Sequence, residues 1–330
     1  MKVIKIWFVK GLSWIGAWAL IIFLIIISPS AGMSQAYEAE MDSILTNKSV
    51  EEQIEVLNQL SEKYRYNDPK KAEYFVREAL RLAYNLENRQ NLALTLKNLG
   101  NVKYVIGEFD TALILYNDSY NIYKIIKDSV GWSTCLNNIA VIHISYGEFT
   151  VAIEKLLEAV DAKIKLNDMY LASVFLRNIG NCYYYQGDYL FAMEYYIKSY
   201  DLTEYFNDPQ HSMMLQISIG SIYEAQNDFN RALEYYQNAL IVADSLNDLY
   251  FKSIILNNLG LVNYNLGSFP VALEILTKSL VLKEEIDFNQ GIPNTLLLIG
   301  KIYEEFGELE KSNEIYIRCM KICYELKDKL

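Results

Sequence analysis

The sequence predicts an all-α protein built as an array of seven two-helix repeats. Hydrophobic residues make up 52% of the chain, which is enough to form a core. Only five prolines and fifteen glycines occur in 330 residues, as expected of a helical protein. One sequence pattern recurs every forty residues and fills positions 51–330 without an insertion. These three observations together favour a helical repeat array.

The repeat is visible when the chain is written in rows of forty. Its most regular stretch appears as NLGNVKYVIGEF (98–109), NIAVIHISYGEF (138–149), NIGNCYYYQGDY (178–189), SIGSIYEAQNDF (218–229), NLGLVNYNLGSF (258–269) and LIGKIYEEFGEL (298–309). The predicted repeats are 51–90, 91–130, 131–170, 171–210, 211–250, 251–290 and 291–330. Each repeat is one unit that must stack on its neighbours to bury its apolar face.

The first half of each row predicts a helix, which we call helix A. In the second repeat Leu96, Leu99 and Val102 follow helical spacing on one face. The small residue at Gly100 would let another helix approach closely. Gly107 then ends helix A, because glycine tolerates left-handed backbone angles. Its equivalents in later rows are Gly147, Gly187, Asn227, Gly267 and Gly307.

The second half of each row predicts another helix, helix B, which begins after an acidic residue or serine. These starting residues are Glu108, Glu148, Asp188, Asp228, Ser268 and Glu308. Aspartate and serine side chains are good helix caps, whereas glutamate acts through the helix dipole. Four aspartates between the rows are predicted to cap the next helix A, at Asp128, Asp168, Asp208 and Asp248. Pro69 follows Asp68 at a first helical position, where its missing N–H costs little.

The pattern resembles the tetratricopeptide repeat. Leu96, Leu99, Gly100 and Ala112 match the motif, as do the recurring residues Tyr183, Tyr223, Tyr303, Tyr116, Tyr196, Tyr236, Ala79, Ala159 and Ala239. The resemblance covers 51–330 and implies a right-handed superhelix, an α-solenoid. The period is forty rather than thirty-four and the motif's late proline is absent, which suggests longer helices. Forty-residue repeats of this kind occur in kinesin light chains and in bacterial peptide-sensing regulators.

The first 36 residues differ from the repeats. Lys2, Lys5 and Lys10 precede the apolar run GLSWIGAWALIIFLIII (11–27), and small residues follow it. This order is that of an export signal, and the run is also close to the length of a short membrane anchor. The basic flank before the run and the acidic leader at 37–50 place the repeats outside the cytoplasm. We predict a signal peptide or a membrane anchor over 1–36, and a periplasmic or outward-facing, membrane-anchored protein.

Composition and motifs argue against several other classes. The net charge of −11 disfavours nucleic acid and anionic lipid, so contact with membrane is expected only through the N-terminal segment. No catalytic motif occurs, and we predict no enzyme activity, cofactor or metal. Four cysteines show no metal or redox spacing, and Cys182 takes a core position in its row.

One feature of helix A points to a ligand. Asn98, Asn138, Asn178 and Asn258 recur in mid-helix, although asparagine is a mediocre helix former. In the families that this chain resembles, asparagines at this position face a concave groove and bind a peptide backbone. An amide can both donate to and accept from a peptide. The alternative is that these amides bond to neighbouring repeats. The resemblance places further residues on the same surface: Asn101, Tyr104, Asn137, Arg177, Asn181, Tyr184, Asn257 and Tyr264.

The resemblance therefore implies a non-catalytic scaffold of the bacterial envelope. It would bind a protein or peptide ligand, as an extended or helical segment, in the concave groove. A second hypothesis is the sensory portion of a bacterial signal-transduction protein, whose histidine kinase or helix-turn-helix output is not in this chain. A third is a scaffold in envelope assembly.

The last helix raises a separate question. It carries the apolar residues Ile315, Cys319, Ile322 and Leu326, and no polar capping helix follows it. Terminal repeats need such a cap. The sequence therefore predicts either a fragment of a longer chain or a protein that forms a homodimer or docks through this end.

Overall fold

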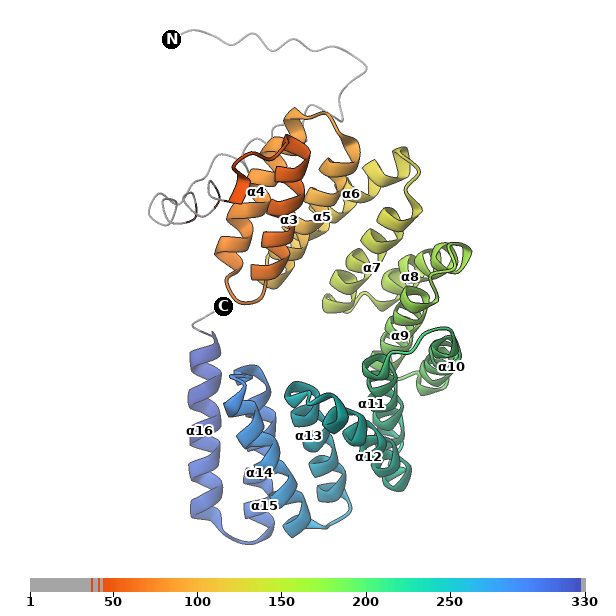
Figure 1. Cartoon of the computed structure of the whole chain (residues 1–330). Helices are drawn as coiled ribbons and strands as arrows, with labels where there is room; N and C mark the ends of the chain where they lie inside the picture. The colour runs from red at the N-terminus through yellow and green to blue at the C-terminus, as the bar shows by residue number, and fades with distance from the viewer. Residues whose placement is uncertain (1–36, 38–40, 42–43, 328–330) are drawn as a thin grey trace, which may run out of the picture. The chain divides into compact units, whose positions relative to one another are not determined.

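The computed structural model describes residues 37, 41 and 44–327, and within them it contains fourteen α-helices and no strand (Figure 1). The helices divide into two compact units, one ending at Cys135 and the other beginning at Leu136. This boundary falls inside α7 (Ser129–Ser145). The all-α fold and its consecutive helix pairs confirm the predicted solenoid class.

Two complete repeats lie in the first unit. They consist of α3 (Val50–Tyr64), α4 (Pro69–Asn85), α5 (Arg89–Val105) and α6 (Phe109–Ile125). Each helix A packs on the helix B of its own repeat, and α4 also packs on α5. The core of the first two repeats includes Leu57, Phe75, Leu96 and Leu99, all fully or almost fully buried.

The second unit continues the same order. After α7 come α8 (Phe149–Lys165), α9 (Met169–Tyr185), α10 (Tyr189–Asp201), α11 (Pro209–Ala225), α12 (Phe229–Leu246), α13 (Leu249–Asn265), α14 (Phe269–Glu285), α15 (Ile292–Glu305) and α16 (Leu309–Lys327). Short 3₁₀ helices follow α10 at Leu202–Tyr205 and α14 at Asn289–Gly291. The odd-numbered helices are helices A, and each starts within two residues of the predicted row.

The recurring glycine in helix A makes room for helix B. A Cβ atom on Gly100 would lie 2.6 Å from the ring of Tyr116, and one on Gly220 would lie 2.7 Å from the ring of Tyr236. Both distances are shorter than any van der Waals contact. Gly180, Gly260 and Gly300 face Tyr196, Leu276 and Tyr316 in the same way. The predicted close approach of the two helices is confirmed, and its partner is this one bulky residue of helix B.

Both helices of a repeat end in left-handed backbone. Gly107, Gly187 and Asn227 end helices A with φ of 83°, 79° and 59°, as the sequence predicted. Helices B end in the same conformation without glycine, at Glu87, Lys127, Asn167, Asn247 and Asp287. The sequence analysis did not predict this second set, although Asn167 and Asn247 are of a residue type that tolerates left-handed angles.

The predicted caps are confirmed except at one position. Asp188 and Asp228 accept hydrogen bonds from Phe191 N–H and Arg231 N–H. Asp128, Asp168, Asp208 and Asp248 cap the following helices A in the same way. Glu108 and Glu148 make no side-chain cap bond, as predicted. The prediction for Ser268 is wrong, because its hydroxyl makes no cap bond. Its ψ of 53° lies further from extended backbone than the 75° of Asp188, and serine has a shorter reach.

Serines in helix B join the two helices of a repeat. The hydroxyl of Ser119 donates to the carbonyl oxygen of Ala93 at 2.7 Å, and Ser279 donates to the carbonyl oxygen of Ser253 at 2.7 Å. Ser199 bonds in the same way to Ser173. The sequence analysis treated the serines as small substitutes for alanine, but they also add a buried hydrogen bond to every second repeat.

The last helix does not expose the apolar residues that the sequence singled out. Cys319 is buried, and Ile315 and Ile322 pack against the core formed with α14 and α15. These three residues therefore do not form an open apolar face, because they pack on the core of the sixth and seventh repeats. The exposed apolar side chains of α16 include Ile317 and Tyr324.

The other sequence predictions on the core and the N-terminus have separate outcomes. Cys182 is fully buried, as its row position predicted. No helix in the described part of the chain has the length and apolar character needed to cross a membrane. The predicted signal peptide or anchor at 1–36 lies outside the described residues.

We expect Gly100→Ala to lower the free energy of unfolding by about 1–3 kcal/mol, because the new methyl group collides with Tyr116. In an unconstrained helix the same change would be stabilising by about 1 kcal/mol. Thermal and urea unfolding followed by circular dichroism would measure the difference.

The third repeat offers a matched rescue, since it has Ala140 and Leu156 at these two positions. The double variant Gly100→Ala, Tyr116→Leu should recover part of the lost stability. If the single variant were as stable as the parent, the close contact would not constrain the repeat.

Candidate functional site

The predicted site residues lie on helices A. We call the position of Asn98 and its equivalents the asparagine row, and the surface that carries it the helix-A face. Going through the repeats, this row consists of Asn58, Asn98, Asn138, Asn178, Ser218, Asn258 and Leu298. The sequence analysis missed Asn58, although it lies forty residues before Asn98.

In the first unit the row forms a buried hydrogen-bonded network. Nδ2 of Asn98 donates to Oδ1 of Asn58 at 2.9 Å, and Asn98 is only 8% exposed. Nδ2 of Asn58 donates in turn to the hydroxyl of Thr95 and to the carbonyl oxygen of Ile54, both at 2.9 Å. The amides of Asn58 and Asn98 therefore join α3 to α5. In the first unit this agrees with the alternative hypothesis, that the asparagines bond to neighbouring repeats.

Asn101 and Asn181 serve the tyrosines that pack on the neighbouring glycines. Oδ1 of Asn101 accepts a hydrogen bond from the Tyr116 hydroxyl at 2.9 Å, and Oδ1 of Asn181 accepts one from Tyr196 at 2.7 Å. In the fifth repeat Ser221 takes this place, 3.1 Å from the Tyr236 hydroxyl. Each polar residue thus lets a tyrosine hydroxyl be buried with a partner.

The same position is apolar in two repeats whose helix B has leucine in place of the tyrosine, whereas the first repeat has Ser61 opposite Val76. The third repeat pairs Val141 with Leu156, and the sixth pairs Leu261 with Leu276. The residue after the helix-A glycine or alanine therefore changes with the residue that packs on it. The presence of Asn101 and Asn181 is therefore explained by the tyrosine hydroxyls that they accept hydrogen bonds from. Their role in binding stays a prediction.

In the second unit a second amide network joins α7 to α9. Nδ2 of Asn178 donates to Oδ1 of Asn137 at 2.9 Å, and Nδ2 of Asn137 lies 3.5 Å from Oδ1 of Asn138. Asn178 is half-buried, and its own Oδ1 accepts no hydrogen bond from another described residue. The network thus orients Asn178 while leaving an acceptor open.

Further along the second unit, Asn257 and Asn258 differ in their hydrogen bonds. Oδ1 of Asn257 accepts from the Thr295 hydroxyl at 2.7 Å and from Nζ of Lys283 at 3.2 Å. Lys283 is almost fully buried, and burial lowers its pKa to about 8. Asn258 is half-buried and makes no side-chain hydrogen bond within the described residues. Asn257 is thus a structural link, whereas the Asn258 amide is open.

Two cations on the helix-A face have no counter-ion among the described residues. Lys97 in the first unit is half-buried, and burial is the main cause that lowers its pKa. Arg177 has the same repeat position in the second unit, and burial lowers its pKa too. Its guanidinium donates to Sδ of Met214 at 3.0 Å, a weak acceptor.

A carboxyl group and tyrosines lie on the same face. Oε2 of Glu224 accepts a hydrogen bond from the Tyr236 hydroxyl at 2.8 Å, and burial raises the pKa of Glu224. The pKa of Tyr184 is raised by burial and by the nearby Glu224. Tyr104 and Tyr264 pack on Phe109 and Phe269, with ring centroids 5.4 and 5.5 Å apart.

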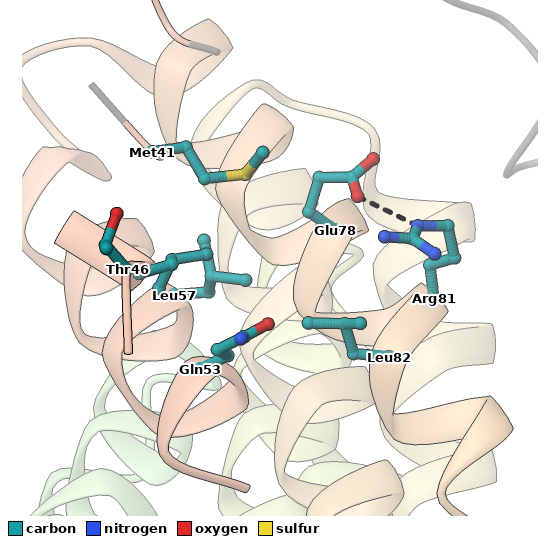
Figure 2. A pocket seen from close by; sticks show the side chains of 8 residues that line it. Met41, Thr46, Gln53, Leu57, Glu78, Arg81 and Leu82 are labelled. Carbon is teal, nitrogen blue, oxygen red and sulfur yellow. Dashed lines mark hydrogen bonds and ion pairs between the residues drawn. The ribbon is translucent and has the colours of Figure 1, made fainter. Parts of the chain in front are cut away.

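The first unit also contains a pocket of about 380 Å³, away from the predicted site residues (Figure 2). Met41, Leu57 and Leu82 form its apolar wall. Glu78 and Arg81 line it as an ion pair with 2.9 Å between the charged atoms. No catalytic or ligand-binding arrangement is evident from this set of side chains.

The helix-A face offers open amides, tyrosine rings and unpaired charges. In the part of the chain that the structure describes, no three His, Cys, Asp or Glu side chains come together as metal ligands.

The repeats are similar to a known family. Residues 170–244 match the family model of the tetratricopeptide repeat. No curated protein matches the chain in sequence. The fold prediction is confirmed by this match together with the likeness to solved structures.

Three solved structures illustrate that likeness. The apo form of RapI has 17% identity and a TM-score of 0.68, covering 84% of this chain and 99% of that one. A Rap protein complexed with competence and sporulation factor has 18% identity and a TM-score of 0.64, covering 94% of this chain and 88% of that one. NprR in complex with its cognate peptide NprX has 16% identity and a TM-score of 0.62, covering 95% of this chain and 92% of that one.

We expect the two kinds of asparagine to respond differently to mutation. Asn98→Ala should lower the free energy of unfolding by about 1–2 kcal/mol, because Asn58 loses a buried donor. Asn258→Ala, which removes no hydrogen bond between described residues, should stay within about 0.5 kcal/mol of the parent. Urea unfolding of both variants measures the contrast. An equal loss in the two variants would mean that the whole row is structural.

Proposed function

We propose that this chain, of which residues 170–244 match the tetratricopeptide-repeat model, is a non-catalytic scaffold that binds a protein or peptide segment on its helix-A face. The open amides of Asn178 and Asn258 carry the proposal. A peptide backbone presents N–H and C=O groups in alternation, and an amide side chain can pair with both without reading side chains.

The packing of the repeats supports this assignment. Asn178 is held by Asn137, so little side-chain entropy would be lost when a ligand binds. Both amides lie on helices rather than on mobile loops, which gives a preformed surface. Two similar structures are complexes, one of NprR with its cognate peptide and one of a Rap protein with competence and sporulation factor.

The binding test compares the two open amides with a control asparagine. The full-length chain would be screened against a display library of random dodecapeptides, and the best peptide measured by fluorescence anisotropy. The double variant Asn178→Ala, Asn258→Ala should weaken binding by about tenfold or more, since each lost hydrogen bond contributes about 1 kcal/mol.

The matched control is Asn117→Ala, which changes an exposed asparagine on α6, a helix B. It should leave the affinity unchanged. Recovery of no peptide, or equal affinity for the double variant and the parent, would contradict the proposal.

We also propose that the repeats act outside the cytoplasm, in a bacterial envelope. Support comes from the basic, apolar and small-residue order of residues 1–36. Residues 1–50 fused to alkaline phosphatase, an enzyme active only outside the cytoplasm, should give activity in bacteria. The triple change Lys2→Glu, Lys5→Glu, Lys10→Glu should reduce it. A fusion protein that accumulates in the cytoplasm without phosphatase activity would refute export. The mass of the exported product would separate a cleaved signal from an anchor.

A second candidate function is the sensory portion of a signalling protein. It is favoured by the likeness to NprR, a quorum sensor from B. thuringiensis. The reading frame downstream of Leu330 separates the two candidates. A membrane span followed by kinase motifs, or a helix-turn-helix segment, would make this chain a sensor.

A further inference from the structure

Two opposite charges lie on neighbouring helices A of the second unit. Arg177 is on α9 and Glu224 is on α11, and these helices contact each other directly (Figure 1). Arg177 reaches Met214 on α11, and Glu224 lies close to Tyr184 on α9. Tyr184 follows Arg177 by two helical turns, so the two charges are about 10 Å apart along the helix axis.

Neither charge has a counter-ion among the described residues. Asp208 is an acid whose charge raises the pKa of Arg177. Its Oδ1 is already used as a helix cap, because it accepts a hydrogen bond from the N–H of His211 at 3.2 Å. Glu224 accepts one hydrogen bond, from the Tyr236 hydroxyl. Both side chains are half-buried, so each has lost part of its hydration without gaining an ion pair.

Packing of the repeat does not require these charges. The position of Glu224 is held by Tyr104, Ile144, Tyr184, Tyr264 and Glu304 in other repeats. The position of Arg177 is held by Lys97, Asn137, Ile217 and Asn257. A desolvated, unpaired charge is unfavourable, and an opposite charge that arrives with a ligand removes that cost.

We propose that the face shared by α9 and α11 binds a peptide segment of defined charge polarity, with an acidic group at Arg177 and a basic group at Glu224. The inference rests on the proposed function and adds the ligand's charge pattern and direction. An extended chain rises about 3.3 Å per residue, so the two ligand charges would be about three or four residues apart. Tyr184 lies beside the Glu224 subsite and offers a ring for an apolar residue of the ligand.

The test uses the full-length chain and an array of hexapeptides with acetylated N-termini and amidated C-termini. In the array one Asp and one Lys occupy every pair of positions on an alanine–tyrosine background, next to versions that carry only one charge or none. We expect the strongest binding for an acid and a base three or four residues apart, in one order only.

Each variant should remove one half of this preference. Arg177→Gln should weaken the best peptide by at least about tenfold and abolish the preference for Asp, while the preference for Lys remains. Glu224→Gln should do the converse. The control variants Glu194→Gln and Lys198→Gln change an exposed ion pair on α10 and should alter neither preference.

The outcomes separate this inference from the proposed function. Peptide binding without a charge preference, or with a preference that both variants retain, would overturn the charge pattern and leave peptide binding in place. Binding of no peptide in the array or in the dodecapeptide library would overturn both. Thermal unfolding of Arg177→Gln and Glu224→Gln near the parent's midpoint shows that a loss of binding is not a loss of fold.

Discussion

The contact between a glycine of helix A and a bulky residue of helix B is the constraint on which five of the described repeats depend. In four repeats a glycine meets a tyrosine at a distance that leaves no room for a methyl group, as at Gly100 and Tyr116. This contact sets how closely the two helices pack. The stacking of one repeat on the next uses the residues around it, so the spacing of the array follows from it.

The same contact also shapes the surface that we assign to binding. A buried tyrosine needs a partner for its hydroxyl, and the partner is the residue next to the glycine, Asn101 or Asn181. Where leucine replaces tyrosine, at Leu156 and Leu276, that neighbour is apolar. In these repeats the bulky residue of helix B and the polarity of the residue after the helix-A glycine or alanine therefore change together.

The remaining polar groups of that face divide by their partners. The amides of Asn98 and Asn257 complete hydrogen bonds between repeats and contribute to stability. Arg177 and Glu224 each make a single hydrogen bond and Asn258 makes none among the described residues, although all three are half-buried. Incomplete pairing is unfavourable in a free protein. On the surface that we assign to binding, these incompletely paired groups would gain partners when a ligand replaces the solvent.

By itself the sequence determined the repeat, its period, the helix-A ends at residues such as Gly107, and the core positions, because these depend on local spacing that recurs every forty residues. It also identified the asparagine row. Only the tertiary structure decided that Asn98 bonds to Asn58 and that Asn178 bonds to Asn137 rather than to its row neighbour Asn138. It also revealed the left-handed end at Lys127 and the missing cap at Ser268. The physical reason is that a side-chain hydrogen bond depends on rotamers and on the offset between neighbouring helices, which the periodicity of a sequence does not record.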